Sequence, residues 1–354
     1  MNTLQKIYRK DRHITRLLIM MVVWMVFMAI TKFDKFYAIA NFQTIAGKFP
    51  EFGLMSLGAM LCMITGGIDL SSVGIANMTS ILMALYMRSR AAGGAEISGL
   101  VIAEVLLFAA CIGFLAGSLN GILISKIHIP PILATLGVNQ LLTGIALVVT
   151  NGKAVSDIPM AFSSTINQKL LKVVPGKRGT VTGLIPVQLL FFIAAAVFVW
   201  FLLSRTSYGK KLYLTGTSEK VARFSGLKVD RLLIVTYALS DMLAALGGMI
   251  MLANYNSARS DYGSVYTLQC ILIVVLGGVS PTGGKGKISG VVLSIILLSL
   301  LEAGINRFPQ ISSYYITLIW VRCCFWSWCS TTLWSTPLSA KNYNIIPKSA
   351  RNPG

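Results

Sequence analysis

Residues 184–203 read LIPVQLLFFIAAAVFVWFLL and contain no charged side chain. A helix of about 20 apolar residues spans the hydrocarbon core of a bilayer, which is roughly 30 Å thick. Because that core holds no water, every backbone N–H and C=O group must be paired within the spanning structure. The segment is too long for a barrel strand. It therefore predicts a transmembrane α-helix.

Similar apolar segments recur along the chain and define the expected fold. Segment 42–65 carries Lys48, Pro50 and Glu51 in its first half, so we expect a broken helix that its neighbours shield from lipid. Together with 184–203 the segments make ten expected spans, and the predicted fold class is an all-α, polytopic membrane protein. The other segments lie near 17–31, 68–87, 99–125, 129–150, 232–254, 264–280 and 288–305, and a last one begins near 313.

The overall composition supports a membrane protein. Hydrophobic residues make up 55% of the 354 positions and charged residues only 12%, whereas a soluble domain is about one quarter charged. Mean hydropathy is +0.72. These values exclude a soluble enzyme, a secreted disulfide-rich domain and a fibrous chain.

Basic residues, which give a net charge of +19, cluster between the apolar segments. Lys and Arg collect at the cytoplasmic ends of membrane helices, and this placement explains the charge better than a nucleic-acid-binding surface does. We expect the basic N-terminus, 1–16, and the basic segment 204–231 to face the cytoplasm. The longest external loop is then 151–183, although it also carries several basic residues. The first span resembles a signal peptide but lacks a small-residue cleavage site, so we interpret it as a signal anchor.

Residues for metal, redox or nucleotide chemistry are sparse. The chain has two histidines, and Cys62, Cys111 and Cys270 are each isolated in an apolar segment, so no metal site or cofactor is expected. The turn 277–287, GGVSPTGGKGK, has the glycine spacing of a phosphate-binding loop but holds Gly284 where that loop needs lysine. We therefore do not expect this chain to hydrolyse nucleotides or to act as an enzyme.

Polar residues and glycines inside the expected spans are the remaining candidates for structure or transport. Each polar side chain must find a partner or a water-filled path, and the simplest role is an interhelical hydrogen bond of about 1 kcal/mol. Gly113, Gly117 and Gly121 recur every four residues, which predicts a face for close helix packing. The polar candidates are Asp69, Glu104, Asn120, Asn139, Gln140, Asp241 and Glu302.

Short motifs follow one another in a fixed order: TGGIDLS at 65–71, AGSLNG at 116–121, PILATLG at 131–137, SYGKKLY at 207–213, VARFSG at 221–226, VLGG at 275–278 and GGKG at 283–286. Together they resemble the permease family of bacterial ABC importers for monosaccharides, typified by ribose, xylose, arabinose and galactoside systems. The resemblance extends from about residue 40 to 320. The sequence departs from the usual pattern of this family at Ile132, at Thr143 and at an inserted Ser72. These departures affect the identity of the substrate more than membership of the family. Residues 257–263 and 159–162 also resemble permeases for the furanosyl signal autoinducer-2.

The resemblance implies a permease of the bacterial inner membrane that translocates a monosaccharide or related small polyol. It implies a transmembrane dimer with a second copy or a paralogue, separate cytoplasmic ATPase subunits and a periplasmic sugar-binding protein. Pentose, hexose and autoinducer-2 are not separated by the sequence. The alternatives are an ion-coupled secondary carrier that uses Asp241 or Glu302 as its titrating group, and a membrane-embedded enzyme, for which no nucleophile and base pair is evident.

Two sets of site residues follow. Segment 204–231 is long enough for a docking helix, with Thr217 or Ser218 as its N-cap, Glu219 in its first turn and Gly226 as its stop. The neutral amides of Asn120, Asn139 and Gln140 can bond sugar hydroxyls without trapping a charge, and we place them on the translocation path. The expected ATPase-coupling residues are Gly216, Ser218, Glu219, Ala222, Arg223, Ser225 and Gly226.

The expected pattern fails after Trp320, where the chain reads VRCCFWSWCS. An arginine, three cysteines and two tryptophans interrupt the tenth span. Back-translated and read in a neighbouring frame, this stretch encodes apolar residues such as Leu, Val and Met. We therefore interpret 321–354 as a frameshifted tail in which Cys323, Cys324 and Cys329 have no function. The alternative is an unusual interfacial segment rich in cysteine and tryptophan.

Overall fold

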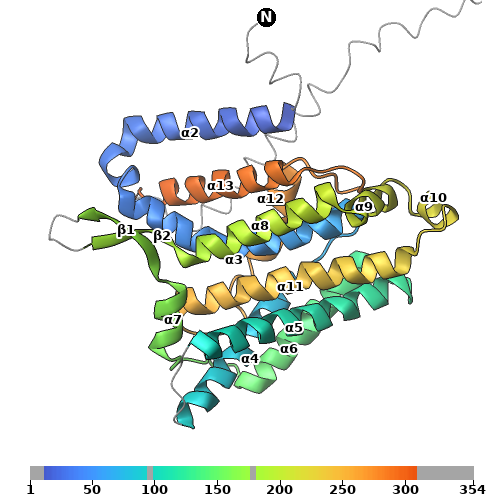
Figure 1. The fold of residues 1–354 in the computed structure, drawn as a ribbon, viewed down its shortest axis with the longest axis horizontal. Helices are drawn as coiled ribbons and strands as arrows, with labels where there is room; N and C mark the ends of the chain where they lie inside the picture. The colour runs from blue at the N-terminus through green and yellow to red at the C-terminus, as the bar shows by residue number, and fades with distance from the viewer. Residues whose placement is uncertain (1–11, 94–98, 176–180, 309–354) are drawn as a thin grey trace, which may run out of the picture. The chain divides into compact units, whose positions relative to one another are not determined.

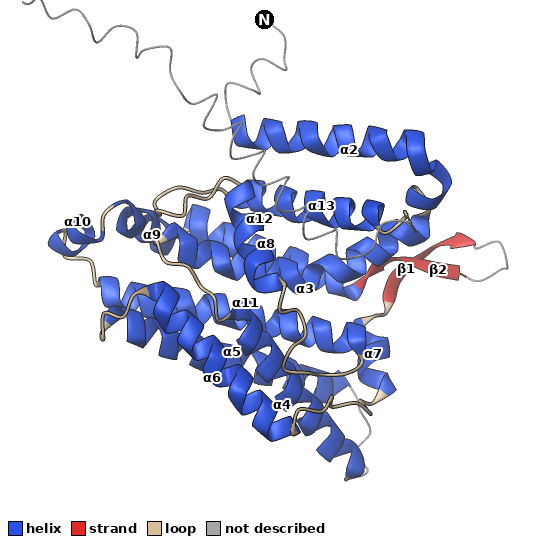
Figure 2. Ribbon diagram, turned by 180° about the vertical axis from the view of Figure 1, so that it is seen from behind, coloured by secondary structure: helices blue, strands red, loops and turns tan. Residues whose placement is uncertain are grey.

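The computed structural model describes residues 12–93, 99–175 and 181–308, and its secondary-structure elements are all helical apart from one hairpin (Figures 1 and 2). The expected all-α class of a polytopic membrane protein is confirmed. The elements are α2 (Arg12–Phe36), α3 (Ile39–Ile64), α4 (Ser72–Ala92), α5 (Gly99–Ser125), α6 (Pro131–Thr150), α7 (Met160–Ile166), β1 (Lys169–Pro175), β2 (Val181–Pro186), α8 (Val187–Arg205), α9 (Ser207–Thr217), α10 (Glu219–Phe224), α11 (Val229–Tyr255), α12 (Tyr266–Leu276) and α13 (Ile288–Ile305).

Six helices among the described residues are long and apolar enough to cross a membrane, namely α2, α5, α6, α8, α11 and α13. Helices α3 and α4 are also long but more polar, and α12 is apolar but short. Each expected span before residue 309 coincides with one of these nine helices. The tenth expected span and the proposed frameshifted tail lie outside the described residues, so the count of ten stays a prediction.

Helix α3 corrects one expectation. The segment was predicted to be broken, yet it is a single helix that runs through Pro50. Proline removes one backbone donor, a loss that membrane helices tolerate where neighbouring helices surround them. Here α8, α11, α12 and α13 pack against α3, and its residues are buried from Phe49 to Ile64. The predicted shielding by neighbouring helices is therefore confirmed from Phe49 onward but not at the exposed Lys48, and the predicted break is wrong.

Helix α11 packs against α3, α4 and α5, and glycines bring the backbones together. A Cβ atom on Gly121 of α5 would lie 2.5 Å from Cα of Ile234, and side chains at Gly113 and Gly117 would collide with the backbone of α11. On α3, a Cβ atom on Gly58 would lie 2.5 Å from the carbonyl oxygen of Ser240. The predicted glycine packing face is confirmed, and its partner is α11.

The two longest connecting segments, one with α7 and the hairpin and the other with α9 and α10, lie at opposite ends of the helices (Figure 1). At one end, which we call the hairpin end, α7 precedes the antiparallel strands β1 and β2, with Leu170 opposite Ile185. At the other, the α10 end, α9 and α10 project from the helices. The expected external loop 151–183 thus holds a short helix and most of a hairpin.

The glycine packing face of α5 predicts that two Gly→Ala changes have opposite effects on thermal stability. Gly117→Ala should force α5 away from α11 and lower the melting temperature of the detergent-purified chain, because overpacking a tight contact costs about 1–3 kcal/mol. Gly144→Ala is the matched control. A Cβ atom on Gly144, which lies in α6, would have no neighbour within 4 Å, and alanine favours a helix over glycine by about 1 kcal/mol. Equal melting temperatures for the two variants would contradict the packing role.

Candidate functional site

Helix α10 has the start and stop that the sequence predicts. The Ser218 hydroxyl accepts a hydrogen bond from the backbone N–H of Val221 at 3.4 Å, so Ser218 is the N-cap. At the other end Gly226 has φ +77°, a left-handed conformation that favours glycine. The N–H groups of Gly226 and Leu227 donate to the carbonyls of Arg223 and Ala222, at 3.0 and 3.2 Å. This pair of bonds is a Schellman motif.

Arg223 fixes α10 relative to the start of α11. Its guanidinium lies 2.6 Å from the Asp230 carboxylate and 2.9 Å from the Glu219 carboxylate. Hydrogen bonds to Asp230 and then to Glu219 raise the pKa of Arg223. All three side chains are exposed, and such pairs contribute little to stability. Their effect is therefore mainly to orient α10.

Helix α10 carries two exposed apolar side chains in a loop that is otherwise basic. Phe224 is 91% exposed and Val221 is 53% exposed, whereas Ala222 is buried against Val229 and Leu233 of α11. Exposed aromatic side chains of this kind act as anchors in protein interfaces. The sequence analysis did not single out Phe224 or Val221 as site residues. Their i, i+3 spacing outside any apolar span was the signal that could have found them.

Gly216, an expected coupling residue, lies at a junction of three segments. The N–H of Gly284 donates to the carbonyl of Ile64 at 2.9 Å, and Gly216 packs against both residues so closely that a side chain would overlap them. The Tyr213 hydroxyl of α9 also donates to the carbonyl of Gly286 at 2.8 Å. Helix α9 is thus joined to the end of α3 and to the glycine-rich turn 277–287. We call this contact the glycine junction.

Asn120, expected on the translocation path, lies in a buried polar cluster. Its amide donates to Ser71 Oγ at 2.8 Å and to Asp241 Oδ2 at 2.9 Å. The Asp69 carboxylate accepts from Ser71 Oγ at 2.6 Å and from Ser240 Oγ at 2.8 Å. These side chains lie on the 65–71 connection, α5 and α11. For Asp69, Asn120 and Asp241, the predicted interhelical hydrogen bonding is confirmed.

The two other residues expected on the path lie on α6. Asn139 is partly buried and packs against Gly74 of α4, while Gln140 is exposed. The structure therefore does not bring Asn139 or Gln140 to the cluster around Asn120. Their place on the path stays a prediction.

Glu51 shows how a third carboxylate is accommodated inside the bundle. It accepts hydrogen bonds from the Tyr266 hydroxyl at 2.5 Å, the Asn254 amide at 3.1 Å and the Tyr255 hydroxyl at 3.4 Å. These donors lie on α11 and α12, so the network ties both helices to α3. The Glu51 side chain is buried.

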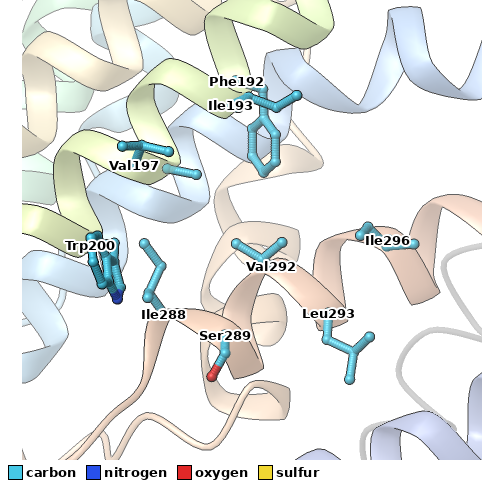
Figure 3. Close-up of a pocket in the computed structure, with 10 residues that line it drawn as sticks. Phe192, Ile193, Val197, Trp200, Ile288, Ser289, Val292, Leu293 and Ile296 are labelled. Atoms are coloured by element: carbon cyan, nitrogen blue, oxygen red, sulfur yellow. The ribbon is translucent and has the colours of Figure 1, made fainter.

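The lining of the cavities and the metal-ligating residues limit the kinds of ligand that the described residues can bind. An apolar groove of about 400 Å³ lies between α8 and α13, lined by residues such as Phe192, Trp200 and Val292, with Ser289 as its one polar side chain (Figure 3). Such a lining suits hydrocarbon rather than a sugar. Within the described part of the chain, no group of three or more His, Cys, Asp or Glu residues could hold a metal ion.

Comparison with known proteins identifies relatives over most of the chain. The family model described as "Branched-chain amino acid transport system / permease component" matches residues 41–321. A ribose import permease protein of Bacillus subtilis is 33% identical over 74% of this chain and 76% of its own length. Its counterpart in Escherichia coli K12 is 31% identical over 80% and 83%. An autoinducer 2 import system permease protein of Yersinia enterocolitica is 31% identical over 75% and 76%. No solved structure matches the chain.

These matches confirm the resemblance that the ordered motifs carried, and they set aside the secondary carrier and the membrane enzyme as alternatives. The chain belongs to the branched-chain amino acid transport system / permease component family, and it is the permease component of an ABC importer rather than an enzyme.

Proposed function

We propose that this permease carries a monosaccharide or a closely related small polyol across the bacterial inner membrane. The observation that carries the proposal is the identity of 31–33% with ribose import permeases over 74–80% of the chain. The relatives named for autoinducer 2 extend the same substrate class, since that signal is also a furanosyl polyol. The family description mentions branched-chain amino acids, but the Bacillus, Escherichia and Yersinia relatives are named for ribose or autoinducer 2.

The energy for transport comes from separate ATPase subunits that dock on α10. The exposed Phe224 and Val221 offer an apolar anchor, and the basic residues around them suit an acidic groove on the partner. Ala222 and Arg223 hold the helix on α11, so a push on α10 moves a rigid element rather than a loose loop. The sequence has no phosphate-binding loop, which agrees with ATP hydrolysis by separate subunits.

The glycine junction offers a route from α10 into the membrane. Helix α9 follows α8 directly and ends at Ser218, the N-cap of α10. Through Gly216, α9 contacts Ile64, which directly precedes the connection that carries Asp69. Backbone contacts of this kind cannot compress, so movement of α9 displaces that connection.

The remaining partners are those that membership of the ABC importer permease family implies. With residues 1–16 and the α10 end in the cytoplasm, the hairpin end faces the periplasm and receives the solute from a sugar-binding protein. A second permease, identical or paralogous, completes the pore. The broad apolar surfaces of α5, α6 and α8 are available to this second subunit and to lipid.

The docking proposal is tested by titrating purified ATPase subunits into permease proteoliposomes and measuring stimulated ATP hydrolysis. Phe224→Ala should weaken the apparent affinity about tenfold, because an aromatic anchor is worth about 1.4 kcal/mol or more. Gly226→Val and Glu219→Lys should also weaken the apparent affinity. Valine is strained at the φ of +77° found at residue 226, and lysine reverses the charge in the first turn of α10. Phe114→Ala removes an exposed phenylalanine from α5 and is the control. Unchanged titrations for all three α10 variants would refute docking at this helix.

The path proposal is tested by alanine at Asn120, Asn139 and Gln140. Each change should lower the uptake rate more than the apparent affinity, because the binding protein rather than the membrane site sets affinity. Asn120→Ala should also lower the melting temperature, since it removes the 2.9 Å donor to Asp241, whereas the exposed Gln140 should leave it unchanged. Normal uptake by all three variants would place the path elsewhere.

A further inference from the structure

A polar cavity of about 330 Å³ lies between α3 and the end of α13. It is at the hairpin end, because Gln43 of α3 accepts a hydrogen bond from Lys169 of β1 at 3.0 Å. Its charged lining consists of Lys48 on α3, Glu302 on α13 and Arg307 just beyond α13. Phe49 and Phe52 supply aromatic surface. This volume is within the range of small-molecule sites, which combine apolar walls with a few polar groups.

The charged groups of this cavity differ from those of the buried networks. Among the described residues, none donates a hydrogen bond to the Glu302 carboxylate, and Lys48 forms no ion pair within 4 Å. Arg307 donates to the Asn41 side chain and retains further N–H donors. Charged side chains at membrane depth are costly and mark ligand pathways. These three therefore line open space that a polar ligand can occupy.

The balance of charge selects the class of ligand. An anion would meet the Glu302 carboxylate, and a cation would meet both Lys48 and Arg307. Glu51 lies near enough to act on Glu302 electrostatically, as Lys48 does, so the group holds two acidic and two basic side chains. A sugar hydroxyl both donates and accepts, so a neutral polyol can satisfy the carboxylate and the two cations together. Its C–H faces suit Phe49 and Phe52.

We infer that this cavity is a binding station for the transported monosaccharide on the periplasmic side of the permease. Glu302 accepts hydrogen bonds from sugar hydroxyls, and Lys48 and Arg307 donate to them. This inference rests on the proposed function. It assigns Glu302 to substrate contact and places a station on α3 and α13, apart from Asn120, Asn139 and Gln140.

The station is tested by substrate protection of a cysteine in the cavity wall of the full chain in nanodiscs. Ala303→Cys should be modified by a charged methanethiosulfonate reagent, and D-ribose in excess should slow that modification. Ser164→Cys, exposed on α7, is the control that D-ribose should leave unprotected. Peptide mass spectrometry reads the labelled fraction at each position separately from the native cysteines. L-leucine serves as the zwitterionic probe.

Protection by D-ribose but not by L-leucine supports the station. Glu302→Gln should then raise the half-protecting concentration of D-ribose about tenfold or more, because hydrogen bonds to charged groups contribute about 1.5–3 kcal/mol. Glu104→Gln changes an exposed glutamate that pairs with Arg90 outside the cavity and should leave protection unchanged. Protection by L-leucine alone, or equal effects of the two glutamine variants, would overturn the inference.

ATP-dependent uptake separates this inference from the proposed function. If the complete importer takes up D-ribose while neither probe protects Ala303→Cys, the function stands and the station is wrong. If neither D-ribose nor D-xylose, L-arabinose or D-galactose is taken up or protects the cysteine, the proposed substrate class and the station both fail.

Discussion

A carboxylate inside a bilayer has to be paired by the protein, and Asp69 is paired by four donors. They are the backbone N–H and hydroxyl of Ser71, at 2.9 and 2.6 Å, and the hydroxyls of Ser72 and Ser240, at 3.3 and 2.8 Å. Asp69 belongs to a non-helical connection, and such backbone is tolerated at membrane depth only where protein encloses it. The glycines of α5 bring that helix close enough to α11 for Asn120 to reach Asp241. Pairing of this one group thus holds the connection between α3 and α4 against α11, and Asn120 adds α5 by donating to Ser71 Oγ and to Asp241.

The same constraint distinguishes carboxylates that are hydrogen-bonded inside the bundle from one that lines a cavity. Glu51 is surrounded by tyrosine and asparagine donors and ties α3 to α11 and α12. Glu302 lies on a neighbouring helix and faces a cavity together with Lys48. At the α10 end, backbone contacts at Gly216 join α9, which directly precedes α10, to the end of α3 and the connection that carries Asp69. The permease can therefore be described as two polar regions, one toward each end of the helices, joined by tightly packed helices.

Much of this fold is encoded locally and could be predicted. Apolar length predicted the helices, the spacing of Gly113, Gly117 and Gly121 predicted a packing face, and Ser218 with Gly226 predicted the ends of α10. Long-range pairing could not be predicted, because nothing local relates Asp69 to Asn120 and Asp241. The continuous α3 was missed because tertiary packing outweighs the local effect of Pro50. The β1–β2 hairpin was missed because its strands lie within a loop of mixed composition.

The thermal unfolding of Asp69→Asn in the detergent-purified full chain tests the central role of this pairing most directly. Asparagine keeps the size of the side chain but places an NH₂ group where an oxygen accepts from serine hydroxyls, which should leave a buried donor unpaired and cost about 1–3 kcal/mol. The matched control is Asp157→Asn, which changes an exposed aspartate in the connection between α6 and α7. We predict a clear fall in melting temperature for Asp69→Asn and none for Asp157→Asn. Equal melting temperatures for Asp69→Asn and the unmodified chain would contradict the account.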